Sequence, residues 1–131
     1  MTEEERALVA YRMERAHEAI DEAKMLFNAG HINLYVNRLY YACFYAVSAL
    51  LLTKNLSTSK HGHLRSLMHR EFVKTGLIPK ELGGHFDLLF DSRLKGDYAD
   101  FASFKADDVS GWLEETQKFV TQAEALIPKL T

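Results

Sequence analysis

Three groups of residues in this 131-residue chain have types and spacings that suit chemistry. The first lies in the segment NRLYYACFYAVSALL, where Arg38, Tyr41 and Tyr45 are spaced so that they share one face of a helix. A guanidinium beside two phenols can hold a phosphate or stack a nucleobase. The alternative is a packed row of buried tyrosines with bonded hydroxyls and a paired arginine, which is the commoner role for aromatic rows at helical spacing.

The second group is a run of histidines with basic neighbours: Lys60, His61, His63, Arg65, His69 and Arg70. We considered a metal site. His61 and His63 are two residues apart and point to different faces of a helix. The sequence therefore predicts no metal site. The alternative to a ligand site is a solvated basic helix face.

The third group is the segment RLKGDY. Arg93 and Lys95 suit the negative end of a helix, and Gly96 suits a left-handed terminal turn. These residues can also form a simple helix stop held by a salt bridge. We expect Asp97 to meet an arginine, either Arg93 or Arg38, because a carboxylate beside an apolar bundle is costly when it has no partner.

Helical periodicity predicts the elements that position these residues. Thr2 and Glu5 form a capping box at the start of the chain, and Pro128 is expected to end the last helix. No segment alternates as a strand does. The sequence predicts one all-α domain over 1–131, an up-and-down bundle of about five helices. Their expected ranges are about 2–29, 32–54, from Ser59 or Lys60 to Gly76, from Pro79 to near Gly96, and 106–128.

Simple bundle topology separates two of the candidate residues. The second and fourth helices would run in the same direction, which places Arg38 and Arg93 roughly 25 Å apart at a rise of ~1.5 Å per residue. A single site would then need a bent connection or a dimer. The segment 39–52 is apolar nearly all round a helix, so we expect a homodimer that hides the remainder.

Composition excludes several classes of protein. Lys and Arg number 16 against 18 Asp and Glu, a formal charge of -2, so any nucleic-acid contact must come from a local patch. The single cysteine, Cys43, excludes an internal disulfide, and its apolar neighbours predict an inert thiol. The charged start MTEEERALVA lacks a signal peptide, and the apolar run of about 14 residues is shorter than the ~20 of a membrane span. We expect a cytoplasmic protein with no membrane association.

Four segments together resemble a known family. NRLYYACFYAVSALL, then SKHGHL, then FVKTG, then R-x3-DY are similar to the stand-alone HEPN-domain proteins of bacteria and archaea, whose name stands for higher eukaryotes and prokaryotes nucleotide-binding. The resemblance extends from about Ala7 to Leu126. It implies an all-α bundle that commonly dimerises. It also implies a partner, because many such proteins are encoded beside a minimal nucleotidyltransferase in toxin–antitoxin or substrate-binding pairs.

The resemblance also bears on catalysis. Active HEPN ribonucleases carry an R-x4-6-H motif near the end of a late helix, and both subunits act on RNA without metal. The matching arginine is Arg93, but Tyr98 stands where the histidine is expected. A phenol with a pKa of ~10 exchanges protons less readily near neutrality than imidazole at ~6.5, which argues against ribonuclease activity. We interpret Arg12-x4-His17, on the first helix, and Arg65-x3-His69, one residue short, as chance matches.

We therefore expect a non-catalytic protein that binds a nucleotide, an RNA-like ligand or a nucleotidyltransferase partner. No catalytic residue, metal or cofactor is predicted. One alternative is a metal-independent ribonuclease toxin of a toxin–antitoxin pair, with His61 as the acid–base group and Arg93 stabilising charge. Another is a helical assembly module without a ligand. The candidate ligand-binding residues are Arg38, Tyr41, His61, Arg93, Asp97 and Tyr98.

Overall fold

The chain folds into helices, which confirms the predicted all-α class. The structure is a computed structural model that describes residues 1–98 and 103–131, without the side chains of residues 96–98. In these ranges there is no strand. The helices are α1 (Glu3–Asn28), α2 (Ile32–Thr53), α3 (His61–Met68), the π-helical turn η1 (His69–Val73), α4 (Lys80–Tyr98), α5 (Ala106–Val109) and α6 (Trp112–Leu130). The five expected helices are α1, α2, α3 with η1, α4 and α6, and α5 is an extra turn.

The predicted capping box is present at the start of α1. The Thr2 hydroxyl accepts from the backbone N–H of Glu5 at 3.0 Å, and the Glu5 carboxylate accepts from the N–H of Thr2 at 3.2 Å. These hydrogen bonds lower the pKa of Glu5. At the other end, Gly30 takes a φ of +81°, the left-handed turn that glycine reaches without strain. The local signals therefore determined α1 almost to the residue.

Four helix ends differ from the prediction. The third helical segment ends with η1 at Val73 rather than at Gly76. The last helix begins at Trp112 rather than at residue 106, because the Tyr35 hydroxyl donates to the carbonyl of Val109 at 2.8 Å and holds α5 as a separate turn. It then continues through Pro128 to Leu130. A proline so near the end of a helix removes only one backbone hydrogen bond, so the last turn still forms. The α4 helix continues past Gly96 to Tyr98.

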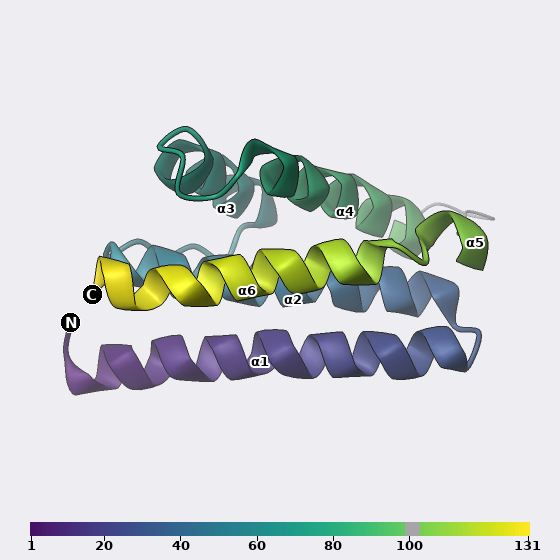
Figure 1. Cartoon of the computed structure of the whole chain (residues 1–131), viewed down its shortest axis with the longest axis horizontal. Helices are drawn as coiled ribbons and strands as arrows, with labels where there is room; N and C mark the ends of the chain where they lie inside the picture. The colour runs from purple at the N-terminus through teal and green to yellow at the C-terminus, as the bar shows by residue number, and fades with distance from the viewer. Residues whose placement is uncertain (99–102) are drawn as a thin grey trace.

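The central element is α2, which packs against α1, α4 and α6 (Figure 1). Its buried residues cover most of its circumference within one chain, so covering the helix does not by itself require a second subunit. Cys43 on this helix is fully buried, and burial raises the pKa of its thiol, while its inertness stays a prediction. No helix in the described ranges is long and apolar enough to cross a bilayer.

The predicted topology was wrong in one respect: α2 and α4 run in opposite directions (Figure 1). After α2 the loop 54–60 returns along the helix, so that His61 at the start of α3 lies against Tyr40 and Phe44. The η1 turn that follows α3 lies beside the end of α2, where Lys54 pairs with Glu71 at 3.7 Å. A non-helical loop thus makes one pass along the bundle, and every later helix is reversed relative to the prediction.

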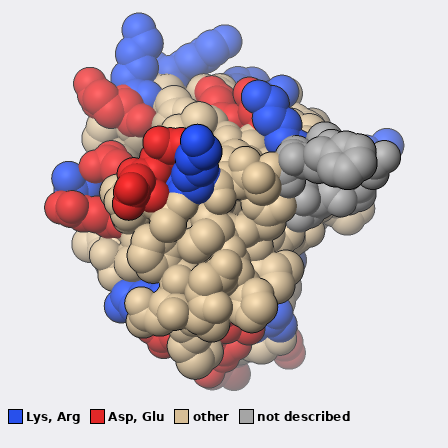
Figure 2. Space-filling view, turned by 90° about the vertical axis from the view of Figure 1, so that its right-hand side faces the viewer, with Lys and Arg blue, Asp and Glu red and all other residues tan. Residues whose placement is uncertain are grey.

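Charge is interleaved on the end of the bundle drawn in Figure 2. Lysine, arginine, aspartate and glutamate side chains mix along its upper part, and the middle of the face is mostly uncharged. The view agrees with the near-zero net charge of the sequence. A binding surface for an anion must therefore be built from a few particular cations.

Candidate functional site

Tyr41 lies between two arginines that come from different helices. The guanidinium carbon of Arg38 is 4.9 Å from the centre of the Tyr41 ring, and that of Arg93 is 5.5 Å from the same centre. The Nη2 of Arg93 also donates to the Tyr41 hydroxyl at a long 3.5 Å. The expected separation of roughly 25 Å was therefore wrong, because antiparallel α2 and α4 bring the start of one beside the end of the other.

His61 joins the same group of side chains from α3. Its Nδ1 is 2.6 Å from the hydroxyl of Tyr40, and its ring stacks on Phe44 with centres 4.6 Å apart. The edge of the ring meets Tyr41 at 5.9 Å. Burial lowers the pKa of His61, and the positive charge of Arg93 lowers it further. We call Arg38, Tyr40, Tyr41, His61 and Arg93 the cation–aromatic cluster.

The two arginines of the cluster have different surroundings. The Arg38 side chain is 24% exposed, lies 3.6 Å from the carboxylate of Glu22 and donates to the Asn37 side chain. Arg93 is only 8% exposed and also lies over the ring of Tyr40 at 5.2 Å. A buried guanidinium on two aromatic faces is held in one orientation, whereas Arg38 can exchange its acidic neighbour for another anion.

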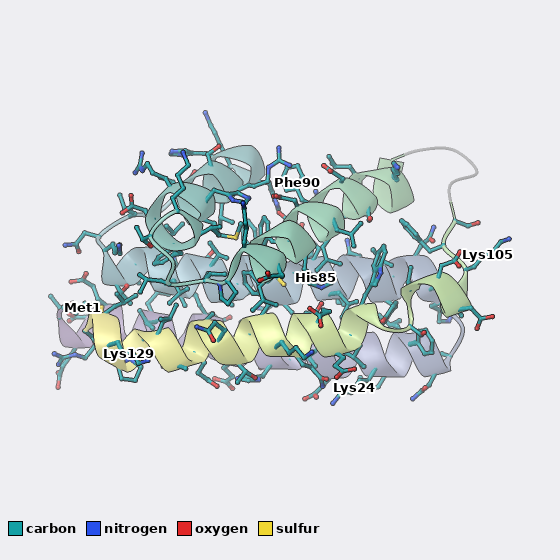
Figure 3. All side chains as sticks on the ribbon, turned by 45° about the horizontal axis from the view of Figure 1, so that its top comes forward. Met1, Lys24, His85, Phe90, Lys105 and Lys129 are labelled. Atoms are coloured by element: carbon teal, nitrogen blue, oxygen red, sulfur yellow. The ribbon has the colours of Figure 1, made fainter. Side chains whose placement is uncertain are left out.

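Further cation–aromatic pairs continue the cluster on both sides. Tyr45 lies 5.9 Å from Tyr41 and carries Arg15 at 5.0 Å from its ring centre. Arg65 of α3 covers Phe90 of α4 at 4.1 Å, and Figure 3 shows Phe90 on the side of α4 that faces α3. Guanidinium and aromatic groups from α1, α2, α3 and α4 therefore form one strip of neighbouring side chains, in which Tyr45 adjoins Tyr41 and Phe90 adjoins Tyr40.

Four of the six sequence-predicted residues meet in this cluster: Arg38, Tyr41, His61 and Arg93. The side chains of Asp97 and Tyr98 lie outside the described part of the chain, so the expected Asp97–arginine pair stays a prediction. Sequence reasoning missed Tyr40, which has the pattern of a core residue. It also left Arg15 and Arg65 out, and only the three-dimensional neighbourhood distinguishes these from other surface cations.

Metal binding has no geometric support in the described ranges. No three histidine, cysteine, aspartate or glutamate side chains gather there as ligands. The two histidine–carboxylate pairs, His17 with Glu124 at 3.1 Å and His69 with Asp87 at 3.0 Å, each stand as a pair between neighbouring helices. The chemistry of the site therefore rests on guanidinium, phenol and imidazole groups.

Comparison with known proteins decides the family. The HEPN domain model matches residues 9–126, most of the chain. The chain belongs to the HEPN family. A HEPN relative from Thermotoga maritima, named a UPF0332 protein, is 42% identical over 130 residues, which cover 99% of this chain and 98% of that protein. Two proteins of Methanocaldococcus jannaschii, each named a "putative toxin", are 28% and 31% identical and match 86% and 90% of this chain, covering 76% and 82% of their own lengths.

A solved structure shares the HEPN fold found here. The crystal structure of TT1696 from Thermus thermophilus superposes with a TM-score of 0.75 and covers 89% of this chain and 96% of that one. Its sequence identity is 15%, so the likeness concerns the arrangement of helices alone. The fold expected from the family resemblance is confirmed.

Proposed function

We propose that this HEPN protein binds a nucleotide or single-stranded RNA through phosphate and base contacts in the cation–aromatic cluster. The observation that carries the proposal is the pair of guanidinium groups, from α2 and α4, on one half-buried tyrosine ring. Arginine suits phosphate because its planar fork donates two parallel hydrogen bonds. An aromatic ring beside it suits a base of any sequence.

The residues take distinct roles in this proposal. Arg93 anchors a phosphate, since its orientation is fixed by two rings. Arg38 exchanges Glu22 for a second phosphate, and Tyr41 stacks a base or bonds through its hydroxyl. Asp97 and Tyr98 belong to the proposal on sequence grounds. Binding is non-catalytic here, because Tyr98 replaces the histidine of the family's ribonuclease motif.

Binding of a labelled short single-stranded RNA tests the proposal. We expect wild-type protein to bind it with an affinity that falls as salt rises, because phosphate contacts release counterions. The double variant Arg38→Gln with Tyr41→Ala should lose binding. The control variant Arg70→Gln, which removes an exposed arginine that pairs with Glu71 outside the cluster, should retain it. Equal binding by both variants would refute the assignment.

Metal-independent RNA cleavage is the second candidate function. It is favoured by the proximity of His61 to Arg93. In the family's ribonuclease motif the arginine and the histidine come from one helix, whereas here they come from α4 and α3. Incubation of RNA with wild type and with Arg93→Ala in EDTA tests it. Cleavage by wild type alone would support a ribonuclease toxin, and intact RNA in both reactions would leave the binding role.

The proposal extends to partners and cellular context. Relatives named as toxins support a role in a toxin–antitoxin pair with a minimal nucleotidyltransferase, in the cytoplasm. Exposed apolar residues such as Leu8, Tyr11 and Leu34, near the aromatic strip, support a homodimer. Light scattering tests the dimer, and a concentration-independent monomer mass would exclude it. Co-expression with a neighbouring nucleotidyltransferase gene, followed by purification, tests the pair.

A further inference from the structure

We infer that Tyr40 fixes the tautomer of His61, so that the imidazole presents Nε2–H as a hydrogen-bond donor to an anionic ligand of the cluster. Tyr40 is thus a positioning residue that acts through His61. The ligand in this statement rests on the proposed function. The tautomer does not, because it follows from contacts within the chain.

The direction of one hydrogen bond carries the inference. The Tyr40 side chain is fully buried, and its hydroxyl lies 2.6 Å from His61 Nδ1. Within the described residues this nitrogen is the hydroxyl's only hydrogen-bond partner. A buried hydroxyl proton without an acceptor is costly, so the phenol donates and Nδ1 accepts. A neutral imidazole that accepts at Nδ1 carries its proton at Nε2.

The surroundings hold the imidazole ring neutral and in place. Phe44 stacks on one face at 4.6 Å with an angle of 29° between the rings, and Tyr41 meets it edge-on at 90°. Among the described side chains of α4, the charged group that acts on it is Arg93. On α3, Arg65 stands four residues after His61 and pairs with Asp91 at 3.6 Å. The aromatic rings of α2 that meet the imidazole are those of Tyr40, Tyr41 and Phe44.

Two pKa directions agree with this geometry. Burial raises the pKa of Tyr40, which keeps the phenol protonated and able to donate. Burial and the charge of Arg93 lower the pKa of His61, which keeps its ring neutral near pH 7. Both shifts favour the state in which the hydroxyl proton lies between the two side chains and Nε2 bears the ring proton.

The tautomer determines what His61 can do. A ring with Nε2–H can donate to a phosphate oxygen, as a backbone amide does. It has no lone pair at Nε2 with which to take a proton from a ribose hydroxyl, so it is poorly prepared to act as a general base there. The pair therefore favours an anion-binding cluster over a cleaving one.

Nitrogen NMR of the uniformly 15N-labelled full chain tests the tautomer directly. At a pH above the His61 pKa, wild type should show Nδ1 in the unprotonated range and Nε2 in the protonated range. Tyr40→Phe should give a mixture of tautomers and a higher His61 pKa, since the donor to the neutral ring is gone. Tyr41→Phe, which removes the neighbouring phenol, should retain the wild-type tautomer.

The outcomes separate the inference from the proposed function. A protonated Nδ1 in wild type would overturn the inference, and this spectrum decides even if Tyr40→Phe fails to fold. With a labelled short single-stranded RNA, Tyr40→Phe should bind about 2-fold more weakly if the two tautomers are equally populated, because only the Nε2–H form donates to the ligand. Unchanged affinity in a variant that has lost the tautomer would refute the donor role. Wild type with the expected tautomer and no RNA binding would refute the proposed function alone.

Discussion

His61 and His85 each pair with a partly or fully buried hydroxyl, and the direction in which the proton is donated differs between them. His61 meets the Tyr40 hydroxyl at 2.6 Å, and His85 meets the Thr116 hydroxyl at 2.9 Å. Thr116 donates to the carbonyl of Trp112 at 2.8 Å, so it accepts from His85 Nε2–H. Figure 3 shows His85 on the side of α4 that faces α6. There the imidazole is the donor, whereas at His61 the phenol is the donor.

The two histidines differ in their exposure to solvent and in which ring nitrogen the hydrogen bond uses. His85 is 7% exposed, and its Nε2–H is consumed within the contact between α4 and α6. His61 is half-buried, and its bond to Tyr40 uses Nδ1 and leaves Nε2 for a ligand. A histidine–hydroxyl pair therefore joins two helices at one place, and at the other it lies within the cluster that we propose binds a ligand. Four experiments test this contrast.

The largest effect is expected for Arg93→Gln in the cluster. A charge-assisted hydrogen bond to phosphate is worth about 1.5–3 kcal/mol, so affinity for short RNA should fall by about 10- to 100-fold. Arg70→Gln is the control, because its side chain is 61% exposed on η1 and pairs with Glu71. Fluorescence anisotropy measures both. Equal affinities in two folded variants would remove Arg93 from the site.

The next largest effect concerns the stability of the contact at His85. Thr116→Val removes the acceptor of a buried N–H, and the free energy of unfolding should fall by about 1–3 kcal/mol. RNA binding should persist, because Thr116 lies outside the cluster. Thr121→Val on the exposed side of α6 is the control. Urea denaturation measures the change, and a loss of equal size in both variants would contradict the special role of this hydroxyl.

A smaller effect is expected for Arg38→Gln. This side chain is partly exposed and already lies near Glu22, so its gain from a phosphate is offset by the loss of that neighbour. Affinity should fall by about 2- to 5-fold, with a shallower salt dependence. Glu22→Gln should act in the opposite direction and tighten binding. A loss as large as that of Arg93→Gln would show that the two arginines are equivalent.

The smallest effect is the dependence of stability on pH. Burial lowers the pKa of His85, so the unfolded chain binds the proton more readily than the folded one. The stability from the neutral ring is complete above the ordinary histidine pKa of ~6.5 and is lost as pH falls below it. In the His85→Gln variant, the denaturation midpoint should depend less on pH between neutral and mildly acidic conditions. An unchanged slope would assign the dependence to other groups, with His61 the next to substitute.

The sequence predicted those features that depend on neighbouring residues. The Thr2 capping box and the turn at Gly30 follow from side-chain and backbone chemistry within a few positions. The burial of Cys43 follows from apolar neighbours at helical spacing. It did not predict the break before Trp112, because that break depends on Tyr35, a residue 74 positions away from the Val109 carbonyl to which it donates.

The amino-acid pattern was enough to identify a helical bundle that resembles the HEPN family, with arginine, tyrosine and histidine as candidate groups. It took the folded arrangement of the helices to show that Arg38, Tyr41, His61 and Arg93 meet. Periodicity states which face of a helix is apolar, but not which way the next helix runs. Here the loop 54–60 returns along α2 without forming a helix, which reverses α4 and brings Arg93 to Tyr41. The same return places His61 on Tyr40, and that contact, absent from any local pattern, orients the imidazole.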